Sequence, residues 1–138
     1  MKRSLLFTAL LAGLLALYGC SKDYAEIPQY GNIVVSPNPI PGEVFTPQVQ
    51  VLESGDGFYK GEFTVIVTKN GQKVIDKVVN VLDPTEKNPI ELKNQQFILT
   101  EKGTYNISCS VKLKASKMME SGQVYASPAI GSSTFMVE

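Results

Sequence analysis

Two kinds of hydrophobic pattern divide the chain into a short leader and a longer remainder rich in predicted β-strands. Residues 5–18 form an apolar run behind Lys2 and Arg3, interrupted only by Thr and Gly. From residue 32 onward, short segments of alternating apolar and polar residues are separated by clusters of Gly, Pro, Asn and Asp. Alternation with a period of two is typical of half-buried strands, and such clusters are typical of turns. The remainder is therefore predicted to be all-β, with no helix longer than one turn.

The alternation predicts seven strands within residues 32–138. The clearest is 104–114, where five apolar residues alternate with polar ones, which predicts one buried and one wet face. Asn70-Gly71 is the strongest short hairpin signal, so the strands on either side of it are expected to be antiparallel neighbours. The fifth strand is expected to be bulged and the last to be interrupted. The predicted strands are 33–35, 45–52, 59–69, 73–82, 90–99, 104–114 and a split final strand, 124–126 with 133–137.

The apolar run near the N-terminus has the form of a cleaved secretory signal. It is shorter than the roughly 20 residues that a membrane-spanning helix needs, and a basic start before a short apolar stretch is typical of a signal peptide. The run ends in Leu17-Tyr18-Gly19-Cys20, which resembles the lipobox of bacterial lipoproteins. The resemblance implies cleavage before Cys20 and acylation of its thiol and new amino group. The predicted organisation is then a signal peptide (1–19), a lipidated Cys with its tether (20–31) and one folded domain (32–138).

The residues directly behind Cys20 bear on where the anchor is placed. The segment 21–26, with a Lys followed by acids, resembles the export signal of lipoproteins of the Bacteroidota type, which implies the outer face of the outer membrane. An ordinary solvated linker explains the same residues. Two or more acyl chains hold a protein stably on a membrane, whereas one does so only marginally. We therefore expect a lipid-anchored protein of the bacterial outer membrane, exposed at the cell surface.

The strand order and one local motif resemble a known class of domain. Seven short strands within residues 32–138 fit an immunoglobulin-like (Ig-like) β-sandwich, which typically has about 100 residues. Gly103-Thr104-Tyr105 resembles the tyrosine corner that opens the sixth strand of such domains. An antibody domain has Cys two residues after this Tyr, where this chain has Ile107, and the chain contains no Trp. The pattern strand-Asn-Gly-strand with a later Gly-Thr-Tyr resembles that of bacterial, adhesion-related Ig-like modules. The resemblance implies a structural role for Tyr105.

Composition excludes several classes of chemistry. The chain has 13 Lys and Arg against 13 Asp and Glu, and it has no His. Zero formal charge gives no basic stripe for nucleic acid, so no nucleic-acid partner is expected. Without His, the Ser-His-Asp and Cys-His sets and the commonest zinc ligand are absent. If Cys20 is acylated, Cys109 has no disulfide partner, and its place on the buried face predicts an inert thiol.

Acidic residues give only weak alternatives to this picture. The loop 54–57 offers one carboxylate, Asp56, where a calcium loop needs several oxygens. Glycoside hydrolysis needs two carboxyl groups at a fixed separation, and ordinary solvated charges explain the available acids equally well. We predict no metal, no cofactor and no enzymatic activity. The acids that a hydrolase would have to use are Asp76, Asp83, Glu86 and Glu91.

Two apolar pairs, Phe58-Tyr59 and Met118-Met119, lie in or beside loops that should be wet. Two interpretations stay open: the pairs cap the end of the core, or they form a contact patch for a partner. If the strands alternate in direction, the loops after the second, fourth and sixth strands share one end of the sandwich, and the chain enters its first strand at that end. Those loops are 53–58, 83–89 and 115–123.

Three functional hypotheses follow from the sequence. The first is an anchored, non-catalytic Ig-like module that binds or assembles with a protein or a glycan, with Phe58, Tyr59, Met118 and Met119 as its candidate binding tip. The second is a structural subunit that joins its neighbours by strand addition at the edge of its split final strand, 122–138. The third is a lipid-anchored hydrolase.

Overall fold

The computed structural model describes residues 26–55, 60–85, 87–114 and 124–138. These residues form ten strands, and no helix occurs among them. The all-β prediction is therefore confirmed for the part of the chain that the structure describes. The strands are β1 (Gln29–Val34), β2 (Val44–Phe45), β3 (Gln48–Glu53), β4 (Lys60–Lys69), β5 (Gln72–Leu82), β6 (Ile90–Glu91), β7 (Phe97–Ile98), β8 (Gly103–Lys114), β9 (Val124–Ala126) and β10 (Ser133–Val137).

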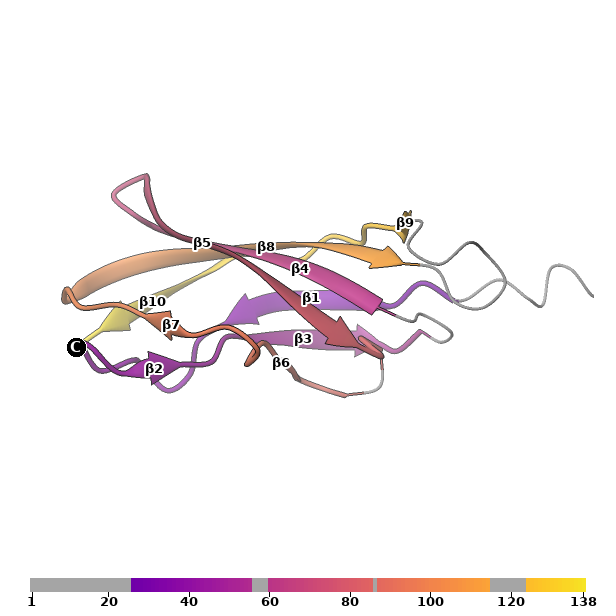
Figure 1. The fold of residues 1–138 in the computed structure, drawn as a ribbon, viewed down its shortest axis with the longest axis horizontal. Coiled ribbons are helices and arrows are strands. Elements are labelled where there is room, and N and C mark those ends of the chain that lie inside the picture. Colours follow the sequence, from indigo (N-terminus) through magenta and orange to yellow (C-terminus); the bar gives the residue numbers. More distant parts are fainter. Residues whose placement is uncertain (1–25, 56–59, 86, 115–123) are drawn as a thin grey trace, which may run out of the picture.

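The strands form two antiparallel layers that pack face to face (Figure 1). One layer has the order β1-β3-β6, and the short pair β2–β7 lies beside it. The other layer has the order β10-β8-β4-β5, with β9 also paired to β8. Because successive side chains point to opposite faces of a strand, each layer turns one apolar face toward the other. The result is an all-β, sandwich-like fold.

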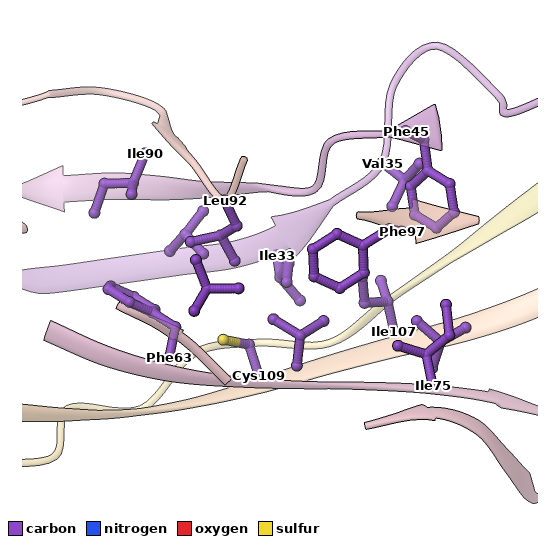
Figure 2. Close-up of a cluster of buried hydrophobic side chains, with 14 of the residues drawn as sticks. Ile33, Val35, Phe45, Phe63, Ile75, Ile90, Leu92, Phe97, Ile107 and Cys109 are labelled. Carbon is purple, nitrogen blue, oxygen red and sulfur yellow. The ribbon is translucent and has the colours of Figure 1, made fainter. Parts of the chain in front are cut away.

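The core lies between the layers and is built from alternate positions (Figure 2). In β8, every odd residue from 105 to 113 is buried and every even residue from 104 to 112 is exposed, as the sequence predicts. Ile33 and Phe97 from one layer and Phe63 from the other fill the space between them. Each of these three side chains has 0% exposure, and burying one fully contributes about 1.5–3 kcal/mol.

The hairpin between β4 and β5 forms where the sequence predicts it. Lys69 pairs with Gln72, which leaves Asn70 and Gly71 as the two turn residues. Their φ angles are +52° and +77°, and positive φ at both central positions is what a type I′ turn requires. The turn makes β4 and β5 antiparallel neighbours along their whole length. A bulge leaves Val74 without a register partner in β4.

Two predicted strands are interrupted, because their halves pair with different neighbours. The predicted strand 45–52 breaks at Pro47, which has no N–H to donate to a ladder, and gives β2 and β3. β2 pairs with β7, whereas β3 pairs with β1 and β6. The predicted strand 90–99 accordingly becomes β6 and β7. Leu92 lies just after β6, is buried, and donates its N–H to the Pro47 carbonyl, so the connecting segment still belongs to the core.

The first strand begins earlier than the sequence suggests. β1 starts at Gln29, whereas the pattern of residues placed a tether as far as Gly31. The reason is the side chain of Tyr30, which is 6% exposed and packs edge-on against Phe63, with 6.0 Å between the ring centroids. This buried ring fixes the beginning of β1 in the sandwich.

The final strand is split, as expected, and its interruption joins the two layers. β9 pairs with the end of β8 and β10 with its beginning. Between them, the Ile33 N–H donates to the Gly131 carbonyl and the Gly131 N–H donates to the Gly31 carbonyl, both at 2.9 Å. A Cβ on Gly131 would lie 2.0 Å from Oδ1 of Asn32, so a larger residue here would have to displace the Asn32 side chain. The Ser133 hydroxyl also donates to the Ile33 carbonyl.

Candidate functional site

The chain enters the sandwich at the end where three connecting loops also leave it. Gln29 at the start of β1 pairs with Glu53 at the end of β3. In the other layer, Lys60 at the start of β4 pairs with Leu82 at the end of β5 and with Lys114 at the end of β8. We call this the entry end, and it lies to the right in Figure 1. The far end holds the β2–β7 pair and the β4–β5 hairpin, to the left.

The residues of the candidate binding tip lie in the segments that connect β3 to β4 and β8 to β9 along the chain. Phe58, Tyr59, Met118 and Met119 lie outside the described residues, and so does the predicted lipidation site, Cys20. Only the residues that flank these loops are described. A contact patch formed by the two apolar pairs therefore stays a prediction.

The loop between β5 and β6 covers the entry end of the core. The Tyr30 hydroxyl donates to the Pro84 carbonyl at 3.0 Å, and the neighbouring Thr85 is buried. The Val51 N–H donates to Oδ1 of Asn88 at 3.1 Å. The amide of Asn88 thus satisfies a β3 backbone group beyond the point where β6 pairs with β3. The loop is held to β1 by one side chain and to β3 by another.

A groove of about 760 Å³ opens beside this loop, between the end of β5 and the segment around β6. The Asn94 side chain donates to the Asn80 carbonyl at 2.9 Å at this site. Two of the four acids considered for hydrolysis, Asp83 and Glu91, line the groove, and Glu91 lies 3.7 Å from the Lys93 ammonium. The other two are not brought to it: Asp76 pairs with Lys73 at 3.0 Å on the exposed side of β5, and Glu86 lies outside the described residues.

Cys109 is a buried free thiol that points into the core (Figure 2). Burial raises the pKa of the Cys109 thiol to about 12, so the thiol keeps its proton at neutral pH. Since the thiolate is the nucleophile, the side chain acts as a small hydrophobic group, as its position in the alternation predicts. Burial also raises the pKa of Tyr30, and Cys109 adds to that effect. Tyr30 is accordingly a neutral hydrogen-bond donor.

Tyr105 makes the hydrogen bond that a tyrosine corner is expected to make. Its hydroxyl donates to the Glu101 carbonyl, four residues upstream, at 2.7 Å. The ring is 3% exposed and stacks on Phe135, with 5.7 Å between the centroids. The Lys69 ammonium lies 5.3 Å from the Tyr105 ring centroid on the exposed side, within the range of a cation–π contact.

Sequence reasoning missed a set of exposed aliphatic side chains at the two ends of the sandwich. Such residues occur singly on strands and turns, where each one reads as an ordinary strand residue. A signal is present only in retrospect: Leu52 and Leu82 stand in the polar phase of their strands. The set comprises Ile27, Leu52 and Leu82 at the entry end and Ile40, Val44 and Ile98 at the far end.

Three further observations complete the description of the site. Among the residues described here, no group of three or more His, Cys, Asp or Glu side chains is arranged to hold a metal ion. No helix in the described ranges is long and apolar enough to cross a membrane. Comparison with protein-family models, curated proteins and solved structures gives no match.

Proposed function

We propose that the protein is a lipoprotein of the bacterial outer membrane, exposed at the cell surface, whose single Ig-like domain binds or assembles with a protein or a glycan without catalysis. The lipobox-like Leu17-Tyr18-Gly19-Cys20 supports the anchor. One structural observation supports the binding or assembly role: β1 begins at the end of the well-packed sandwich where the loops after β3, β5 and β8 also begin. The anchor and these loops then share one end of a rigid domain.

The strand arrangement supports the Ig-like assignment. The ten strands reduce to seven when β2 with β3, β6 with β7, and β9 with β10 are each counted as one interrupted strand. One layer then contains the first, second and fifth strands, and the other contains the seventh, sixth, third and fourth. Three connections cross between the layers, from β3 to β4, from β5 to β6 and from β7 to β8, and Tyr105 lies near the start of the sixth strand, β8.

Strand addition at the final strand remains the alternative function. It requires an unpaired sheet edge. Near β10, part of the sheet edge is already hydrogen-bonded within the chain, because Gly131 and Ser133 bind the backbone of β1. The opposite edge, β5, carries a bulge, and its inward-facing Lys77 donates to the Gln96 carbonyl. Bulges and inward-facing charges are features by which natural edges resist pairing, so these contacts favour the binding module.

The anchor is tested by Cys20→Ala, with Cys109→Ala as the matched control. Cys20→Ala should leave an uncleaved precursor that takes up no radiolabelled palmitate, because the thiol carries the lipid. Cys109→Ala removes a buried thiol and should be labelled like the wild type. A Cys20→Ala protein that is still labelled would contradict the anchor.

Mass measurement on native outer membranes separates binding from self-assembly. A stable complex with a partner of fixed stoichiometry is expected if the domain is a binding module. A ladder of self-multimers would instead support strand addition. The measurement uses the acylated protein in its own membrane, so the geometry set by the anchor is retained.

A further inference from the structure

The two most exposed aliphatic side chains of the described residues, Leu52 and Leu82, lie at the entry end, and Ile27 lies there with them. The far end has aliphatic side chains of similar exposure, Ile40 at 57% and Val44 at 55%. Leu52 is 67% exposed, Leu82 is 66% exposed and Ile27 is 53% exposed. Leu52 is near the end of β3 and Leu82 is the last residue of β5, so they belong to different layers. Ile27 lies just before β1. The three side chains therefore surround one end of the sandwich and do not form a patch on one face.

The path of the chain into β1 keeps Ile27 beside the exit of β3. A Cβ on Gly55 would lie 2.1 Å from the Glu26 carbonyl oxygen and 2.8 Å from the Pro28 nitrogen. Residues 26–28 thus run directly against the backbone that follows β3, and only glycine permits this approach. The chain N-terminal to Glu26 accordingly leaves from the entry end.

The length of the segment before Glu26 limits how far this end can be from an acylated Cys20. Residues 20–25 span at most roughly 20 Å when fully extended. The far end lies roughly 40 Å further away, which is the length of β8, a 12-residue strand. An anchor at Cys20 therefore holds the entry end close to the lipid surface. Tethering also raises the effective concentration of this end at the surface, so weak contacts suffice.

The chemistry of the entry end suits an apolar contact with lipid better than an electrostatic one. Exposed Leu and Ile side chains enter the boundary between headgroups and acyl chains favourably, and anionic lipids attract excess Lys and Arg. Here Lys does not outnumber the acids, and Lys114 pairs with Glu62 at 3.2 Å. The charged residues of this end among those described are Lys60, Lys87, Lys114, Glu26, Glu53, Glu62 and Asp83.

We propose that the entry end rests on the bilayer that holds the anchor, with Ile27, Leu52 and Leu82 inserted at the headgroup level. The inference rests on the proposed function, because it requires acylation of Cys20. Its consequence is an orientation: the far end, with Val44 and Ile98, is presented away from the membrane. Since this end has no excess of Lys among its described residues, anionic lipid should not strengthen the contact appreciably.

The absence of Trp from the chain permits a direct test of this orientation. Single Trp residues are introduced by Leu52→Trp, Leu82→Trp and Ile27→Trp into the full-length, acylated protein. Val44→Trp and Ile98→Trp are matched controls, because these far-end positions are also exposed aliphatic residues, at 55% and 40%. Each protein is reconstituted into phosphatidylcholine vesicles that contain brominated lipids, and a thermal melt verifies that each variant is folded.

The entry-end Trp residues should be quenched severalfold more strongly by brominated lipid than the far-end controls. The quenching should be similar in vesicles with added anionic lipid. If the proteins float with the vesicles but the entry-end and far-end Trp residues are quenched equally, the proposed orientation is wrong. The proposed acyl anchor is not contradicted by that result. Entry-end Trp residues protected from a soluble quencher but not reached by brominated lipid would also overturn the proposal, because a protein would then cover this end. Failure of acylated protein to float would overturn the proposed function itself.

Discussion

The two ends of the sandwich are stabilised in different ways. At the far end, the Glu43 N–H donates to the Ile40 carbonyl at 3.1 Å across Pro41 and Gly42, and Gly42 has a φ of +82°. Pro followed by a positive-φ Gly at the two central positions is typical of a type II turn. The Asn70-Gly71 hairpin and the bond from Tyr105 to Glu101 are equally local. Short-range backbone preferences therefore shape the turns of this end, and long-range bonds join those turns to the rest: the Gly42 N–H donates to the Leu99 carbonyl at 2.9 Å.

At the entry end, the stabilising bonds join residues that are far apart in the sequence. The bond from Tyr30 to Pro84 spans 54 residues, and the bond from Val51 to Asn88 spans 37. Each requires that two strands and a loop are already in place, so neither can form early in a single hairpin. The difference teaches that the turns of the far end can form locally before its strands pair, whereas the described bonds of the entry end depend on the completed sandwich.

The largest effect on this comparison should come from removing the ring of Tyr30. Tyr30→Ala empties a buried site next to Phe63 and also breaks the bond to Pro84, and we expect a loss of about 3–5 kcal/mol. Urea melts of the purified protein measure the loss. Tyr30→Phe is the control, because it keeps the ring and removes only the hydroxyl. Equal midpoints for Tyr30→Ala and wild type would mean that the entry end does not depend on this side chain.

A matched pair of hydroxyl deletions compares the two ends directly. Tyr30→Phe and Tyr105→Phe each leave one backbone carbonyl without its donor, which costs about 1–3 kcal/mol when the carbonyl is buried. The bond from Tyr30 is buried, whereas the bond from Tyr105 is part-buried. Water can reach the Glu101 carbonyl more easily, so Tyr30→Phe should cost more. An unchanged urea midpoint for Tyr105→Phe would mean that Tyr105 does not act as a tyrosine corner, and it would weaken the Ig-like assignment.

Alkaline pH should destabilise the core through Cys109. The pKa of its thiol is about 12 in the folded chain against an ordinary value of 9.0, so the unfolded state loses its proton first as pH rises. The stabilisation is complete below pH 9.0 and is lost as pH rises toward 12, at up to about 1.4 kcal/mol per pH unit. Urea melts at increasing pH should show this decline, and Cys109→Ala should reduce it. Parallel declines in wild type and variant would assign the effect to other groups, Tyr30 first.

The regular strands could be predicted because their information is local. In β8, the polarity of each residue of 104–114 indicates whether its side chain lies on the buried or the exposed face of the strand. Asn70-Gly71 specifies its turn by local backbone preference alone. The break in 45–52 has a local signal, because Pro47 has no N–H to donate to a ladder. The break in 90–99 depends instead on which strand each half meets, and β6 and β7 meet different partners.

Among the described residues of the candidate site, the hydrogen bond of Tyr105 was predictable because a short motif specifies it. The lipobox-like segment ending at Cys20 is also a short motif, and the acylation that it implies stays a prediction. The contacts that close the entry end have no sequence pattern, because Tyr30 and Pro84 meet only through the fold. The exposure of Leu52 and Leu82 likewise depends on where β3 and β5 end relative to their neighbours.

The smallest effect on stability is expected for the candidate tip. If Phe58, Tyr59, Met118 and Met119 form a contact patch, replacing Tyr59 and Met118 with Ser should leave the melting temperature nearly unchanged. The loop held by Tyr30 already covers the entry end of the core, which favours this outcome over a capping role.

The same double replacement should reduce capture of a partner from detergent-solubilised membranes, because a few aromatic and Met side chains concentrate binding energy. The far-end double variant, Val44→Ser with Ile98→Ser, is the control, since it also removes two exposed apolar side chains. If the tip residues cap the core, each tip change should instead cost about 2–5 kcal/mol, and one thermal melt would show it. Unchanged stability together with unchanged capture would leave the tip as incidental surface and would direct the search for a partner to the far end or to the edge of the final strand.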